Sequence, residues 1–112
     1  MKSNVDNPFI ATSAEITTQT DVTASRAIDG TVYHNIGSKP IFVNITIQHA
    51  ANGGDVIAKS DANVVPNLIV AETYDGAISV IVTMLTFIVL PGNYYEATAT
   101  GGSSMKTWIE YK

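Results

Sequence analysis

The sequence predicts an all-β protein: an antiparallel, jelly-roll-like β-sandwich with an extended N-terminal arm. Short segments rich in Val, Ile, Thr and aromatic residues recur at spacings of roughly 8–12 residues, separated by Gly, Pro, Asn and Asp. One segment, 41–48, alternates strictly between apolar and polar side chains, as a half-buried strand does. No segment combines apolar residues at helical spacing with caps. These observations favour a sandwich or jelly roll, with a small barrel as the alternative.

The first 25 residues differ in composition from the rest, because Ser, Thr, Asn and Gln dominate them. Their larger apolar side chains, which follow no helical spacing, are Val5, Phe9, Ile10, Ile16 and Val22. We predict an extended arm over 1–25, with one short strand near 9–17, and a sandwich domain over 26–112. The intermittent apolar residues favour an arm that docks on another protein surface, and a disordered polar tail is the alternative.

The first half of the domain contains the clearest strand. Asp29-Gly30 precedes a strand at 31–34, and the turn at 35–39 contains Gly37, which can adopt a positive φ. Pro40 then opens the alternating strand. One face of that strand carries Ile41, Val43, Ile45 and Ile47, and the other carries Phe42, Asn44, Thr46 and Gln48.

The remaining elements follow from turn residues and β-branched runs. The predicted strands lie at 56–59, 68–74, 78–90, 94–100 and 105–111. They are separated by a turn at 51–55, a loop at 60–67, a hairpin turn at Asp75-Gly76, a turn at 91–93 and a loop at 101–104. The last strand is expected to place Met105, Thr107, Ile109 and Tyr111 on one face, opposite Lys106, Trp108 and Glu110.

The segment 78–90 is apolar over thirteen residues and ends at Pro91-Gly92. A membrane-spanning helix needs about 20 residues, and Ile, Val and Thr dominate this run, so we predict a strand. Both faces of the strand are apolar. One face belongs in the sandwich core. The other is expected to be covered by the arm or by another subunit, because a contiguous exposed apolar patch is unusual on a monomer.

Composition argues against several classes of function. Charged residues make up only 14% of the chain, the net charge is −4, and the six basic residues are scattered, so no basic stripe is available for nucleic acid. Cysteine is absent, and the first twenty residues lack the apolar core of a secretory signal. His34 and His49 flank turns without matching a metal motif, and several carboxylates also fall in turns. We therefore predict no enzymatic activity, no cofactor and no membrane anchor.

Aromatic side chains in the second half of the domain allow an alternative function. Tyr94, Tyr95 and Trp108 could line a sugar-binding face, because aromatic rings stack on the apolar faces of sugars. The commoner role of such residues is cross-strand packing.

Most of 29–112 resembles a β-module of tailed-phage virion proteins, found at the tips of tail fibres and in small capsid decoration proteins. The shared features are a Tyr-x-Asn pair at Tyr33 and Asn35, a Gly-x-Lys-Pro turn at 37–40, the alternating strand, an apolar strand ending Pro91-Gly92 with Tyr94 after it, and a terminal Trp-x-Glu at Trp108 and Glu110. A fibre protein would carry a long shaft before this module. The short arm therefore resembles the decoration proteins more closely.

The resemblance implies a virion structural protein on the outer capsid surface, a homo-oligomer that staples neighbouring subunits of the major capsid protein. Its alternative is a receptor- or carbohydrate-binding tip module of a tail fibre. Under the first interpretation the interface residues are Val5, Phe9, Ile10 and Ile16 of the arm, with Ile81, Leu85 and Phe87 of the long strand. Under the second, host glycans contact Tyr94, Tyr95 and Trp108.

Replacing Phe9 and Ile10 with Ser should reduce capsid binding while the domain stays folded, because the arm loses two of its larger apolar groups. Cosedimentation with capsids measures the binding, and circular dichroism checks the fold. Unchanged binding would remove the arm from the interface.

Overall fold

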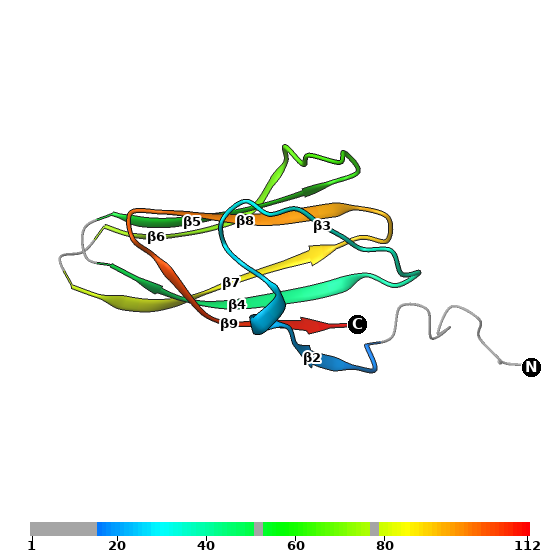
Figure 1. Cartoon of the computed structure of the whole chain (residues 1–112), viewed down its shortest axis with the longest axis horizontal. Helices are drawn as coiled ribbons and strands as arrows, with labels where there is room; N and C mark the ends of the chain where they lie inside the picture. The colour runs from blue at the N-terminus through cyan, green and yellow to red at the C-terminus, as the bar shows by residue number, and fades with distance from the viewer. Residues whose placement is uncertain (1–15, 51–52, 77–78) are drawn as a thin grey trace, which may run out of the picture.

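A computed structural model of the chain describes residues 16–50, 53–76 and 79–112. They form two four-stranded antiparallel sheets packed face to face, which confirms the predicted all-β sandwich (Figure 1). Among the described residues the only helical element is a single 3-10 turn, η3 (Thr23–Ser25).

Each sheet combines strands from both halves of the chain. The first sheet has, in spatial order, β2 (Gln19–Asp21), β9 (Ser104–Tyr111), β4 (Ile41–His49) and β7 (Ile81–Val89). The second has β3 (Tyr33–His34), β8 (Tyr94–Thr100), β5 (Gly54–Asp61) and β6 (Ile69–Asp75).

The strand pairing is nested, which makes the sandwich a jelly roll. β5 pairs with β6, β4 with β7, β3 with β8, and β2 with β9. A long hairpin rolled up into two sheets has this connectivity, and two Greek keys arranged in this way define the jelly roll. The segment 22–32, here called the strap, climbs from β2 in one sheet to β3 in the other, across the side formed by β9 and β8 (Figure 1).

Most of the predicted strands are present, but several boundaries differ. β5 has eight residues instead of four, and β3 has two instead of four. β7 has nine residues instead of the thirteen expected, because Ser79, Val80 and Leu90 lie outside the ladder with β4. The hairpin turn predicted at Asp75-Gly76 is wrong, because Asp75 belongs to β6, and β6 and β7 lie in different sheets. The strand expected near 9–17 lies almost wholly outside the described residues, and the first described strand is β2. Because β2 pairs with β9, the described end of the predicted arm belongs to the sandwich, which corrects the expected boundary at residue 26.

The core lies between the sheets and is built by alternate residues of the long strands. In β4 the inward side chains Val43, Ile45 and Ile47 are fully buried, as the alternation predicts. The remaining buried apolar groups are Ile41 of β4, then Leu85, Phe87, Val89 and Trp108 of the neighbouring strands β7 and β9, and Val56, Ala58, Tyr95 and Ala97 of the facing sheet.

An irregularity in register changes the face of one residue. Between Thr46 and Ile47 the pairing with β9 shifts, so that Thr46 lies opposite Thr107 but Ile47 lies opposite Met105. The extra residue is Lys106, which remains exposed. Met105 therefore packs against the core instead of sharing the outer face with Thr107, as simple alternation predicted.

Ile45→Ala should destabilise the domain by about 3 kcal/mol, because it leaves a cavity in the centre of the sandwich. Thr46→Ala, one residue along but on the outer face, is the matched control and should change the free energy of unfolding by less than about 1 kcal/mol. Urea denaturation measures both. Similar losses in the two variants would contradict the assigned strand orientation.

Candidate functional site

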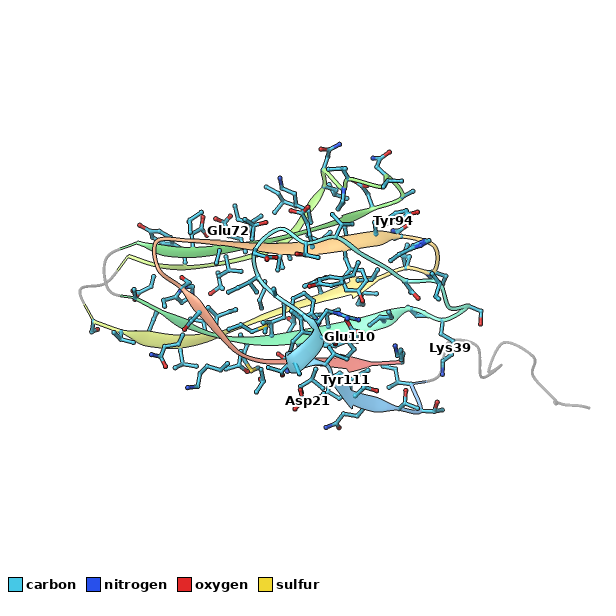
Figure 2. All side chains as sticks on the ribbon, in the orientation of Figure 1. Asp21, Lys39, Glu72, Tyr94, Glu110 and Tyr111 are labelled. Carbon is cyan, nitrogen blue, oxygen red and sulfur yellow. The ribbon has the colours of Figure 1, made fainter. Side chains whose placement is uncertain are left out.

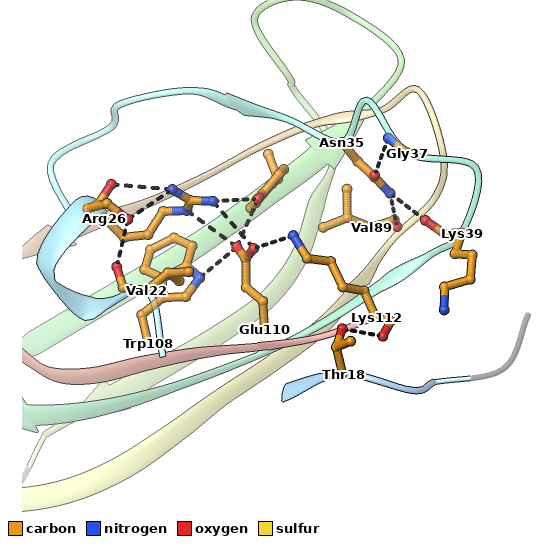
Figure 3. Close-up of polar contacts among 12 residues, drawn as sticks. Thr18, Val22, Arg26, Asn35, Gly37, Lys39, Val89, Trp108, Glu110 and Lys112 are labelled. Carbon is orange, nitrogen blue, oxygen red and sulfur yellow. Dashed lines mark hydrogen bonds and ion pairs between the residues drawn. The ribbon is translucent and has the colours of Figure 1, made fainter. Parts of the chain in front are cut away.

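The terminal Trp-x-Glu pair lies at the centre of a buried polar network. Glu110 is fully buried, and its Oε2 accepts hydrogen bonds from Tyr95 Oη at 2.8 Å and from Trp108 Nε1 at 3.1 Å. The guanidinium of Arg26, in the strap, donates to both carboxylate oxygens at 3.3 Å (Figure 3). Lys112 Nζ approaches Oε1 at 3.9 Å. A buried carboxylate is tolerated because it is paired and hydrogen-bonded in this way.

Aromatic rings surround this ion pair and fix its geometry. Arg26 lies over the ring of Tyr33 at 4.4 Å from the centroid, a cation–π contact. Tyr33 in turn packs edge-on against Trp108 at 5.7 Å. Burial, and then the negative charge of Glu110, raise the pKa of Tyr95 well above its ordinary value, so its hydroxyl stays protonated and keeps donating.

Asn35 joins two turns at the same end of the sandwich. Its Nδ2 donates to the carbonyl oxygens of Lys39 at 2.9 Å and Val89 at 3.2 Å, and its Oδ1 accepts from Gly37 N (Figure 3). Its backbone exchanges hydrogen bonds with the turn after β7, through Gly92 and Asn93. The motif residues that carry the phage resemblance thus act as structural connections.

A pocket of about 450 Å³ opens beside this network. Its polar lining includes Thr17, Arg26, His34, Ser38, Lys39 and Lys112. Arg26 and Lys112 approach Glu110, and Lys39 Nζ donates to Thr17 Oγ1 at 3.1 Å. Each of these three cations therefore contacts another residue of the domain.

A second polar cluster, at the opposite end of the sandwich, contains a serine–histidine contact. His49 Nδ1 lies 2.8 Å from Ser103 Oγ, within the range of a nucleophile and its base. The other ring nitrogen, Nε2, faces the hydroxyl of Thr83 at 2.8 Å, where a catalytic triad has a carboxylate. The imidazole is fully buried, and through these contacts it connects β4 and β7 with the segment before β9.

The two outer faces of the sandwich differ sharply in chemistry. The outer face of the sheet β2-β9-β4-β7, here called the apolar face, has no Asp, Glu, Lys or Arg in β4 or β7. Along and beside β7, Val80, Val82, Met84, Ile88 and Leu90 each leave between 55% and 61% of their surface exposed. Phe42 lies opposite Ile88 and packs edge-on against Tyr111, which extends the apolar face across three strands.

The outer face of the other sheet, here called the acidic face, carries four carboxylates and one lysine on its strands: Asp55, Lys59, Asp61, Glu72 and Glu96. Glu72 projects into solvent from β6 (Figure 2). A shared hydrogen bond with Asp55, followed by the charge of Asp55, raises the pKa of Glu72. Val70 and Tyr74 of β6 are also exposed on this face, but its carboxylates make it easier to hydrate than the apolar face.

The structure corrects the choice of interface residues on the long strand. Leu85 and Phe87 are buried in the core of their own domain, and Ile81 is half-buried on the same side. The exposed side of β7 is the opposite one, with Val82, Met84 and Ile88. The sequence showed that both faces are apolar, but nothing in the strand itself distinguished them. Of the arm residues, Ile16 is exposed beside Phe42 and Tyr111, whereas Val5, Phe9 and Ile10 lie outside the described residues.

The proposed glycan platform is also corrected. Tyr95 and Trp108 are buried, so neither ring can meet a sugar. Tyr94 remains half-buried on the outer side of β8, where it stacks on His34 with ring centroids 3.9 Å apart. One ring, already stacked within the domain, does not form the aromatic face that the alternative requires.

Among the described residues no group of three or more His, Cys, Asp or Glu side chains is placed to hold a metal ion. The same part of the chain contains no helix long and apolar enough to cross a membrane. Comparison with protein-family models, curated proteins and solved structures gave no match to this chain.

Glu110→Gln should destabilise the domain by about 3 kcal/mol, because the substitution leaves the charge of Arg26 without its buried partner. Glu72→Gln, on the acidic face, is the isosteric control and should change stability by less than about 1 kcal/mol. Thermal and urea unfolding measure the difference. Equal stability of the two variants would show that the ion pair is dispensable.

Proposed function

We propose that this protein is a structural component of a phage virion that decorates the outer capsid surface and staples neighbouring subunits of the major capsid protein. The observation that carries the proposal is the contrast between the apolar face and the acidic face. A domain that exposes an apolar face is expected to bury that face against another protein. The resemblance of most of 29–112, outside roughly 49–76, to phage virion modules supports a capsid as that partner.

The contrast also orients the molecule on its partner. In this proposal the apolar face meets the capsid and the acidic face points to solvent. About half of the surface of each exposed side chain on the apolar face is accessible. Burying it in the complex contributes on the order of 1 kcal/mol of binding free energy for each residue. Part of that gain is offset by the entropy lost on association, so binding depends on several residues acting together.

Stapling follows from binding across a seam between subunits. A ligand that binds only the assembled shell stabilises it, because separating the subunits then requires the ligand to be released as well. The buried polar network suits this task, since it holds the strap and both sheets together. No group transfer or cofactor is required.

The fold adds a weaker argument of analogy. Jelly rolls are frequent in viral capsid and lectin domains, although a fold by itself does not determine function. Of these two classes, the lectin interpretation loses its main support with the burial of Tyr95 and Trp108. Ile16 is exposed next to Phe42 and Tyr111, at the apolar face. In this proposal Phe9 and Ile10 of the arm add to the contact with the capsid.

The double variant Val82→Asp and Ile88→Asp should lose binding to capsids at least tenfold, because it buries two unpaired charges in the interface. A tagged wild-type chain is expected to recover the major capsid protein in near-stoichiometric amount from a phage-infected lysate, identified by mass spectrometry. Cosedimentation with purified capsids then gives the affinity of each variant.

Val64→Asp and Val65→Asp form the matched control, since these valines are also exposed but lie in the loop between β5 and β6. The control should bind capsids as the wild type does. Recovery of tail proteins without the capsid protein, or equal loss of binding in the control, would contradict the proposal.

A further inference from the structure

β7 is an edge strand without the usual protection against pairing. Within the described residues it pairs with β4 along one side and with no strand along the other. It has nine residues, with no charged residue, proline or glycine among them. Its ladder with β4 runs from Ile81 to Val89 without a shift in register. A long, regular, uncharged edge readily accepts another strand.

The other three edges of the sandwich each show a protective device. β2 has three residues and includes Asp21, and β3 has only two residues. β6 carries Glu72, and its register with β5 shifts between Ala58 and Lys59. Short length, charge and bulges are the means by which natural sheets block edge pairing. Their absence from β7 alone among the described edges indicates that this edge is used.

We propose that β7 pairs antiparallel with β7 of a second copy of this chain, about a twofold axis, so that two four-stranded sheets become one continuous eight-stranded sheet. Full overlap of the strand places Leu85 at the axis. The outer side chains then meet as Val82 with Ile88 and Met84 with Thr86, and Val80 approaches Leu90. An isologous contact needs a surface that complements itself, and here no pair brings like charges together.

The strand's own composition favours a second copy as the occupant. Every outward position from Val80 to Leu90 is apolar except Thr86, so the pattern is nearly the same when it is read in either direction. Strand addition satisfies the free backbone groups of both copies at once. It also joins the two apolar faces into one surface of twice the width. If the proposed function holds, the dimer therefore offers the capsid a wider contact surface. The pairing itself does not depend on a capsid.

The first experiment is the mass of the full chain in solution, measured by sedimentation equilibrium at tens of micromolar. We expect twice the chain mass of 11.9 kDa for the wild type. Met84→Lys combined with Thr86→Lys should give the monomer mass, because four lysines would gather around the axis on exposed positions. Val70→Lys combined with Tyr74→Lys, on the exposed side of β6, makes the same change in net charge and should remain a dimer.

Circular dichroism confirms that each variant is folded. A monomeric wild type, a trimer, or a lysine variant of β7 that stays dimeric would overturn the proposal. Dimerisation that is lost only when residues 1–15 are deleted would instead assign the contact to the arm, and it would overturn strand pairing as well.

Cysteine cross-linking tests the register, because the natural chain contains no cysteine. Directly opposed residues of an antiparallel pair have Cα atoms about 4.5–5.5 Å apart, within reach of a disulfide, whereas diagonal neighbours are about 7–8 Å apart. Met84→Cys and Thr86→Cys chains should therefore cross-link when they are mixed, and much less when either is oxidised alone. No increase on mixing would overturn the register centred on Leu85.

The two proposals fail separately. A dimer that does not bind capsids would leave the strand pairing intact and reject the stapling function. A monomer that binds capsids through Val82 and Ile88 would reject the strand pairing and support the stapling function.

Discussion

The fold depends on satisfying one buried carboxylate. Glu110 has no contact with solvent, so it is stable only when its partners come together: Trp108 from the same strand, Tyr95 from the opposite sheet and Arg26 from the strap. Loss of any one partner would leave a charge or a polar group unpaired at low dielectric, at a cost of several kcal/mol. The network therefore selects the arrangement in which both sheets and the strap are closed over the core.

His49 plays a corresponding part at the other end of the sandwich, where its ring contacts hydroxyl groups from three separate segments. Between the two polar clusters the core is apolar and depends on volume and shape. The alternating apolar pattern sets the register, because a slip of one residue would turn each strand's apolar face outward. The polar clusters add hydrogen bonds of defined geometry at both ends of the sandwich, and the apolar residues between them supply most of the stability.

Because the interior stabilises the fold, the outer faces can differ in chemistry. One sheet exposes carboxylates together with a few apolar residues of β6, while the other exposes mainly aliphatic side chains along an unprotected edge strand. Both features lie on β7, and the two proposals assign each a protein contact: a second copy for the edge and the capsid for the face. The proposed assembly therefore needs no moving part, only a rigid domain that presents the same surface in every copy.

The sequence by itself determined most of the strands and the inward face of β4, because period-two alternation and turn residues act locally. It also showed that both sides of the 78–90 segment are apolar. Only the tertiary structure decided which side of β7 the domain covers, because both sides are equally apolar and the choice depends on pairing with β4, more than thirty residues earlier. The same holds for Tyr95, Trp108 and Met105, whose burial results from nested pairing and one shift in register. Such contacts join residues far apart in the chain, and no local pattern of side chains encodes them.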